Sequence, residues 1–368
     1  MREYLLICRP LAIFYIPLMK ERILALQSND DASFNALALE VFHYQYKNNA
    51  FYRSYCTLIK KLPDDVKKIS DIPFLPITFF KNHPIKTGDW TAETVFTSSG
   101  TTGMTTSSHH VHDISFYNKI TQIGFEKFYG KIEDYCILGL LPAYLERSGS
   151  SLVAMTDYFI RQSRYAQSGF FLYDHDALRE ILLDNQEKKI PTLLIGVTFA
   201  LLDFSQLVSL SVCQLVQDQP TNRLTDQPTN LIIMETGGMK GRRKEMIREE
   251  LHTILKKGFG VSQIHSEYGM TELLSQGYSK GNGIFAPIPS MRVLLREVTD
   301  PFSIFDLYDK IQSPKSKNGV INIIDLANID TCSFIATDDL GKLYPDGTFE
   351  VLGRLDMADI RGCSLMVD

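Results

Sequence analysis

The sequence predicts an α/β fold in which sheets are layered with helices, followed by a β-rich C-terminal part. In the first two thirds of the chain, segments with apolar residues at helical spacing alternate with short apolar runs of strand length. That alternation is typical of buried strands covered by helices. Beyond residue 290 the apolar runs are strand-like. The chain has 368 residues, 44% of them hydrophobic, so it is long enough to bury a sizeable core.

Apolar spacing assigns the individual elements along the chain. Residues at helical spacing predict helices within 33–60, over 114–128 and over 244–255. The prolines within 71–85 predict extended backbone between the first two, because a proline ring disfavours helical dihedrals in the residue before it. Strands are expected over 135–141, 192–197, 231–234, 291–298, 319–326, 332–337 and 347–354.

The N-terminal residues 4–19 form a strongly apolar run that Arg9, Pro10 and Pro17 interrupt. The run is too short and too broken for a membrane span, and it lacks a small-residue cleavage site. We therefore expect a packing segment, or a start codon placed too far upstream, in a cytoplasmic protein without stable membrane insertion. A signal peptide is the disfavoured alternative.

Charge and cysteine usage exclude several classes of protein. The net charge of −5 argues against a nucleic-acid binder, because phosphate backbones select basic surfaces. The six cysteines are scattered and form no CxxC pair. This usage favours reduced thiols in a cytoplasm over a disulfide framework or a zinc site.

Residues 97–108 form the most informative stretch, because nine of its side chains carry hydroxyls and two of its residues are glycines. Glycine lets the backbone approach a ligand closely, and a run of N–H and O–H groups makes an anion cradle. A flexible Ser/Thr linker is the alternative. It is weakened by Val95 and Phe96 before the stretch and by an amphipathic segment after it. The stretch therefore predicts a phosphate-binding loop.

Two further motifs combine residue types that suit a nucleotide. In 265–272 an aromatic residue, a glycine, a hydroxyl and a carboxylate follow one another, and the carboxylate suits Mg²⁺. In 337–341, Thr-Asp-Asp-Leu-Gly precedes a Gly-Arg pair at 353–354, and a carboxylate there can accept hydrogen bonds from both ribose hydroxyls. Taken alone, the first motif also fits a turn that starts a helix, and the second fits a β-turn rich in Asp and Gly.

Together and in this order, the three motifs resemble those of the adenylate-forming superfamily, which includes acyl-CoA synthetases, peptide-synthetase adenylation domains and luciferases. The resemblance covers about residues 70–363. It narrows to the acyl-protein synthetase (LuxE) family on PFLPITFFK at 73–81, LPAYLERSGSSLV at 141–153, METGGMKGRRKE at 234–245 and RGCSLM at 361–366.

The resemblance implies a ligase that uses ATP and Mg²⁺ to convert a fatty acid, or another carboxylic acid, into an acyl-adenylate. The acyl group then moves to a cysteine, which by position is Cys363, and passes to a partner such as an acyl reductase. Arg361 nearby would raise the thiolate fraction of Cys363. The resemblance also implies an adenylate-forming domain over 1–340 for ATP and acyl binding. A short hinge segment over 341–368 then carries Cys363, and the small C-terminal lid domain is expected to be absent or vestigial.

The resemblance implies a role for each residue that matches a family motif. Tyr268 matches base stacking, and Asp339 matches the ribose ligand with Arg354 beside it. Thr271 matches a phosphate or carboxylate contact, and Glu272 matches the Mg²⁺ ligand, so Thr271, Glu272 and the cysteine are the expected catalytic residues. The phosphate loop matches Ser98, Ser99, Gly100, Thr101, Thr102 and Gly103, and the tight turn beside adenine matches Gly237 and Gly238.

The chain departs from the superfamily pattern in its lysines. Met104 and Thr105 stand where the loop usually ends in Pro-Lys, and the QIK element after Arg354 is not preserved. Lys81, Lys240 or another chain are the candidate replacements. Two alternatives therefore stay open: a ligase that delivers the acyl group to CoA or an acyl-carrier thiol, and a nucleotide-binding subunit without turnover.

Three other features have competing readings. Residues 277–281 fit the G-x-S-x-G nucleophile elbow, but no histidine follows and no helix is expected after them, which disfavours a hydrolase. His109 and His110 are adjacent and would point apart on a strand, so with His112 they indicate neighbours of the nucleotide pocket or exposed residues rather than a metal site. The apolar run 193–202 predicts either a wall of an acyl pocket or a core strand.

Overall fold

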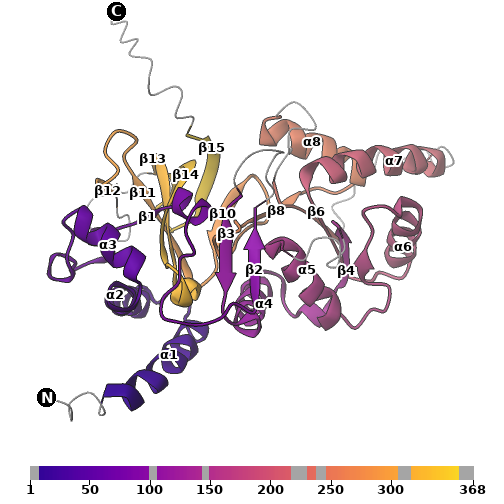
Figure 1. Ribbon diagram of the computed structural model, residues 1–368. Coiled ribbons are helices and arrows are strands. Elements are labelled where there is room, and N and C mark those ends of the chain that lie inside the picture. The colour runs from indigo at the N-terminus through magenta and orange to yellow at the C-terminus, as the bar shows by residue number, and fades with distance from the viewer. Residues whose placement is uncertain are drawn as a thin grey trace, which may run out of the picture.

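The computed structural model describes residues 8–98, 106–142, 149–216, 230–237, 246–305 and 316–355. Its N-terminal part is helical and packs against the β-rich part of the molecule (Figure 1). Buried Gln45 and Asn49 fix this packing, because their side-chain amides donate to backbone carbonyls of 328–331. The elements of this part are α1 (Cys8–Leu24), α2 (Asp31–Asn48), α3 (Ala50–Leu58) and the short strand β1 (Leu75–Pro76), which pairs in parallel with β14.

The main sheet is mixed and runs through both halves of the chain. Its order is β12-β11-β13-β14-β15-β10-β9-β8-β7-β6-β4-β5. The strands from β5 to β8 along this order are parallel, and the others pair antiparallel to their neighbours. The bounds are β4 (Cys136–Leu140), β5 (Gly169–Phe170), β6 (Thr192–Gly196), β7 (Leu231–Glu235), β8 (His265–Tyr268), β9 (Gly277–Ser279), β10 (Ile284–Pro287), β11 (Met291–Arg296), β12 (Ile304–Phe305), β13 (Lys317–Asp325), β14 (Phe334–Leu343) and β15 (Phe349–Arg354).

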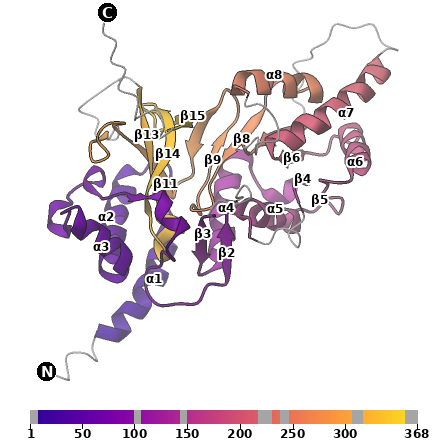
Figure 2. The ribbon, with the colours of Figure 1, turned by 45° about the horizontal axis from the view of Figure 1, so that its top comes forward.

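Helices cover both faces of the parallel strands, which explains why β4, β6 and most of β7 are apolar. Ile137 and Leu193 share a core with α4 and α5, whereas the adjacent Leu138 and Leu194 share a second core with α6, α7 and α8. Figures 1 and 2 show α6 to α8 at the end of the molecule opposite α1 to α3. The bounds are α4 (Ile114–Tyr129), α5 (Ser151–Gln162), α6 (His175–Glu187), α7 (Thr198–Val216) and α8 (Arg248–Phe259).

A separate hairpin of β2 (Thr94–Thr97) and β3 (Ser108–Val111) carries the ends of the hydroxyl-rich stretch. Thr97 pairs with Ser108, so the two ends of the stretch lie side by side. The Ser98 N–H donates to the Ser107 carbonyl at 3.1 Å, and the Ser107 N–H donates to Ser98 Oγ at 2.9 Å. The two ends of the stretch are therefore held together at the end of an ordered hairpin.

The structure confirms the α/β class, the β-rich C-terminal part and the order of the expected strands. The alternative readings of the two nucleotide motifs were wrong: residues 337–341 lie within β14 rather than in a turn, and 269–276 lead into β9 rather than into a helix. Strand β10 follows the G-x-S-x-G match, so the helix that a nucleophile elbow needs does not follow it. The expected domain boundary after residue 340 falls inside β14, and β15 continues the same sheet.

The N-terminal apolar run lies on α1 from Cys8 onward, and residues 4–7 lie outside the described part. Met19 and Ile23 of α1 are buried in the core, as expected of a packing segment. Among the residues that the structure describes, no helix combines the length and the apolar character needed to cross a membrane.

Candidate active site

A cavity of about 1140 Å³ opens where the parallel strands end. Strands β4, β6, β7 and β8 direct their carboxyl ends toward it, the position at which open α/β sheets bind ligands. The hairpin of β2 and β3, the middle of β14 and the end of β15 complete its walls. One end is polar and includes Lys81, Thr97, Ser98, Ser107, Thr271, Glu272, Asp338, Asp339 and Arg354. The other is mainly apolar and includes Leu141, Leu152, Met155, Leu172, Val197 and Phe199, together with Ser150, His175 and Asp203.

The structure brings most of the described sequence-predicted residues together. Ser98, Gly237, Thr271, Glu272, Asp339 and Arg354 all line this cavity, although they come from segments as far apart in the chain as residues 98 and 354. Tyr268 does not line the cavity, but its hydroxyl donates a hydrogen bond to Asp339, which does. Ser99, Gly100, Thr101, Thr102, Gly103, Gly238 and Cys363, together with the candidate Lys240, lie outside the described residues.

The turn that carries Thr271 and Glu272 is held by its backbone carbonyls. His109 Nδ1 lies 2.8 Å from the Thr271 carbonyl, and Asn328 Nδ2 donates to the Glu272 carbonyl at 2.8 Å. Because a carbonyl only accepts, His109 donates through Nδ1, and its Nε2 accepts from the Thr331 hydroxyl at 3.1 Å. Burial lowers the pKa of His109 to about 4, so the ring is neutral at pH 7. His109 thus positions the turn, as a buried neighbour of the pocket.

The three histidines do not form a metal site. His109 is buried while His110 is half-buried on the opposite side of β3, as the strand alternation predicts. His112 stacks on Trp90 with ring centroids 4.8 Å apart. Within the described ranges, no group of three or more His, Cys, Asp or Glu side chains is arranged to hold a metal ion.

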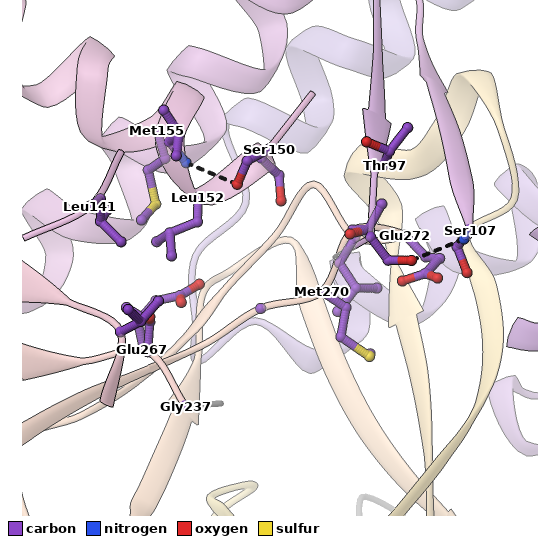
Figure 3. A pocket seen from close by; sticks show the side chains of 18 of the residues that line it. Thr97, Ser107, Leu141, Ser150, Leu152, Met155, Gly237, Glu267, Met270 and Glu272 are labelled. Atoms are coloured by element: carbon purple, nitrogen blue, oxygen red, sulfur yellow. Dashed lines mark hydrogen bonds between the residues drawn. The ribbon is translucent and has the colours of Figure 1, made fainter. Parts of the chain in front are cut away.

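The Glu272 carboxyl lies at the polar end of the cavity, near Ser107 and across from Leu141 and Leu152 (Figure 3). Burial raises its pKa above the ordinary value, and the Ser107 side chain and the charges of Arg354 and Lys81 partly oppose this rise. A single carboxylate at the wall of a polar cavity fits a Mg²⁺ ion that takes its other ligands from phosphates and water.

Asp339 and Tyr268 form a buried pair at the same end. The Tyr268 hydroxyl donates to Asp339 Oδ2 at 2.9 Å, and the Tyr268 ring packs edge-on against Phe349 at a centroid distance of 5.3 Å. Burial raises the pKa of Asp339, against the effects of this hydroxyl and of Arg354. Arg354 Nε lies 3.6 Å from Asp339 Oδ1, and its side chain is 84% exposed. The Tyr268 hydroxyl thus orients the Asp339 carboxyl, and Arg354 places a positive charge beside it.

Gly237 is positioned by a buried carboxylate on β7. Glu235 accepts the Gly237 N–H at 2.7 Å and the Thr198 hydroxyl at 3.3 Å. Although burial opposes ionisation, the His252 side chain, Ser266 and the Gly237 N–H hold the pKa of Glu235 below its ordinary value. Gly237 has φ = +72°, a conformation that favours glycine. The backbone of this turn is therefore fixed where it meets the cavity.

Three residues line the cavity to which the sequence motifs gave no role, or only a candidate one. Lys81 was named only as a candidate replacement for a missing lysine, and it lines the cavity. Ser107, at the far end of the hydroxyl stretch, also lines it. Glu267 was quoted within a motif but given no role; its carboxyl lies in the wall near Leu141 and Leu152 (Figure 3). The available signal was a charged residue inside an otherwise buried strand.

Comparison with protein families finds that residues 18–125 match the family described as "Acyl-protein synthetase, LuxE". A 69-residue stretch is 39% identical to the long-chain-fatty-acid–luciferin-component ligase of Photorhabdus luminescens, and it covers 18% of this chain and 59% of that protein. The chain therefore spans less than two thirds of this relative. The matched residues 18–125 include PFLPITFFK and the hydroxyl-rich stretch, which confirms the resemblance to this family there.

Similar solved structures include a coenzyme A synthetase and a fatty-acid-CoA ligase. The O-succinylbenzoate coenzyme A synthetase of Bacillus subtilis, in complex with AMP, is 18% identical over 71% of this chain and 49% of its own, with a TM-score of 0.39. A long-chain-fatty-acid-CoA ligase of Archaeoglobus fulgidus is 14% identical over 71% of this chain and 51% of its own, with a TM-score of 0.43. Likenesses this distant carry no argument about the present chain.

Proposed function

Starting from the LuxE family match over residues 18–125, we propose that this chain uses ATP to activate a carboxylic acid as an acyl-adenylate and then accepts the acyl group on Cys363. The main support for this proposal is that one cavity at the ends of the parallel strands holds both kinds of group. Groups suited to phosphate, ribose and Mg²⁺ converge at one end of it, and apolar side chains line the other. A nucleotide and an apolar acid can therefore lie end to end.

The polar end offers partners for the phosphates, the ribose and the Mg²⁺ of ATP. Ser98 and Thr271 offer hydroxyls for phosphate oxygens, and the Asp339 carboxyl accepts hydrogen bonds from ribose hydroxyls with Arg354 beside it. Glu272 holds Mg²⁺, which when bound neutralises phosphate charge. Because burial raises the pKa of Glu272, this ligand is lost to protonation at a higher pH than an ordinary glutamate.

Lys81 is the proposed replacement for the missing loop lysine. It lies at the end of a short helical turn (Ile77–Lys81), lines the cavity, and is close enough to Glu272 for its charge to lower that pKa. A cation there stabilises the negative charge of departing pyrophosphate. No lysine after the hydroxyl stretch is then required.

The proposed chemistry has two steps. A carboxylate oxygen of the acid attacks the α-phosphorus of ATP, the bond from that phosphorus to the oxygen bridging to the β-phosphorus breaks, and pyrophosphate leaves with the electron pair. The Cys363 thiol then loses its proton to solvent and attacks the acyl carbon. AMP departs with the former carboxylate oxygen, and a thioester remains for transfer to a partner.

The apolar end suits an acyl chain. Within the run 193–202, Val197 and Phe199 line the cavity, whereas Ile195 and Leu201 are fully buried in the two cores. The core-strand reading therefore holds only up to Gly196, where β6 ends, and Leu201 belongs to α7. Val197 and Phe199 support the acyl-wall reading. The acid is accordingly proposed to be a fatty acid or a derivative of one.

Intact-mass spectrometry after incubation with ATP, Mg²⁺ and a fatty-acid panel tests this function. We expect a hydroxylamine-sensitive gain of one acyl group, absent in Cys363→Ala. Cys56, Cys136 and Cys332 are buried, and burial raises their thiol pKa values, so they are poor acceptors.

Each other outcome has a defined meaning. A thiol adduct that persists in Cys363→Ala overturns the acceptor assignment. Acyl transfer that appears only when CoA is added indicates a ligase with an external acceptor. Absence of AMP formation under all conditions indicates a nucleotide-binding subunit without turnover.

A further inference from the structure

Glu267 is a carboxyl without a partner in the wall of the cavity. It is the third residue of β8, its side chain is only 9% exposed, and it lines the cavity. Among the described residues, none donates a hydrogen bond to its carboxyl or pairs with it as a cation. The carboxyl is thus open only to the cavity, and an unpartnered polar group so placed calls for an explanation.

The local backbone makes room for this carboxyl. A Cβ atom at Gly269 would come within 2.4 Å of Glu267 Oε1, so the carboxyl occupies the space that a side chain at 269 would need. Gly269 itself is exposed and lines the cavity. The carboxyl thus lies between the turn that carries Thr271 and the apolar wall of Leu141, Leu152 and Met155 (Figure 3).

The groups that face Glu267 favour its neutral form. Burial raises its pKa to about 8, with a further contribution from the negative charge of Glu235 on β7. Tyr117 on α4 and Tyr278 on β9 also interact with it, and burial keeps the pKa of both phenols well above the ordinary value. With no cation among the described residues around it, the carboxyl is protonated at pH 7 and has a proton to donate.

We propose that Glu267 recognises a hydrogen-bonding substituent, a hydroxyl or an amino group, on the acyl chain, so that the preferred substrate is a substituted carboxylic acid rather than an unsubstituted fatty acid. This inference rests on the proposed function. A plain hydrocarbon chain laid against Glu267 leaves a buried carboxyl unsatisfied, whereas a substituent satisfies it. Sites built to hydrogen-bond a substrate group reject analogues that lack the group more strongly than apolar pockets reject an added one.

The test compares plain, hydroxylated and amino-substituted acids of equal chain length, with the substituent moved along the chain. The readout is kcat/KM for acid-dependent exchange of pyrophosphate into ATP. For the wild type we expect the best substituted acid to exceed the plain acid by about tenfold or more. Glu267→Leu is expected to bring this ratio to one or below, and Glu250→Leu on the exposed part of α8 is the matched control.

Glu267→Gln separates the two kinds of substituent. The amide still hydrogen-bonds a hydroxyl, but it has no acidic proton to pass to an amine and so forms no ion pair with one. Retention of the preference identifies a hydroxyl, and its loss identifies an amine. Glu267→Leu is expected to fold, because it replaces an unpaired buried acid with an apolar side chain, and an unchanged or raised Tm checks this.

Two outcomes are distinguished from failure of the proposed function. A wild type that prefers plain acids, with a ratio unchanged in Glu267→Leu, overturns the inference while leaving acid activation intact. A wild type that shows no exchange with any acid contradicts the proposed function instead. In that case, calorimetric binding of the same acids to wild type and Glu267→Leu still decides the role of Glu267.

Discussion

The two ends of the cavity treat their carboxylates in opposite ways. At the polar end, Asp339 receives the Tyr268 hydroxyl and lies beside Arg354, and Glu272 lies near Ser107 and within reach of the charge of Lys81. At the apolar end, Glu267 has no hydrogen-bond or ionic partner among the described residues. ATP is the same in every reaction, so a prearranged set of contacts can bind it. The acid can vary, and its substituent can supply the hydrogen bond that Glu267 lacks. We therefore assign nucleotide binding to the polar end and selection of the acid to the apolar end.

Glu272→Gln is expected to have the largest effect and tests whether the polar end binds the nucleotide and Mg²⁺. It removes the proposed Mg²⁺ ligand while keeping the size of the side chain, and we expect exchange to fall by about 10² to 10³-fold. The decrease should be present with every acid tested, because the polar end does not select among acids. Glu250→Gln controls for loss of an exposed carboxylate. Exchange at the wild-type rate in Glu272→Gln would remove the metal role.

Lys81→Met is expected to have an intermediate effect. It removes one of the two cations whose charge reaches Glu272, in a wall that otherwise lacks the loop lysine, and we expect kcat to fall about tenfold with a smaller change in the KM for the acid. Lys81→Arg should restore part of the rate. Lys119→Met, at an exposed position of α4, is the control. Equal rates in Lys81→Met and this control would transfer the role to another residue or chain.

Of these variants, His109→Gln should reduce the rate least. It should change how the free energy of unfolding depends on pH. The folded pKa of His109 lies near 4 and the unfolded value near 6.5, so the unfolded chain binds the extra proton as the pH falls. Stability is therefore full above about pH 6.5 and is lost by up to about 3 kcal/mol as the pH falls to about 4.

The measurement is the free energy of unfolding in urea at several pH values across that window. His265, whose pKa burial also lowers to about 4, remains in the variant and keeps part of the slope. A slope identical to that of the wild type would show that His109 is not a buried neutral group.

Local signals account for what the sequence predicted. The strands at 136–140, 192–196 and 231–235 are short, apolar and bounded by polar residues, and these properties depend on neighbours in the chain. The run 193–202 was harder, because it crosses from β6 into α7 without losing apolar character. The spacing of polar residues distinguishes a strand from a helix only where one face is exposed to solvent. In this buried run the boundary between β6 and α7 could therefore not be predicted.

Roles that depend on distant partners could not be read from the sequence. His109 positions a turn that lies 162 residues further along the chain, and nothing local announces that contact. Glu267 stands out only after β7, α4 and β9 are seen to surround it without supplying a donor or a cation. Motif residues such as Asp339 could be predicted to lie at the cavity because their types and order match a motif, whereas the surroundings of His109 and Glu267 depend on the fold.

The most direct test of the account is exchange of labelled pyrophosphate into ATP by the wild-type protein, with and without a carboxylic acid. Only an enzyme that forms an acyl-adenylate reversibly produces label in ATP that depends on the acid. We expect exchange that requires both the acid and Mg²⁺ and is strongly reduced in Glu272→Gln. Tight ATP binding with no acid-dependent exchange across plain, hydroxylated and amino-substituted acids would contradict the account.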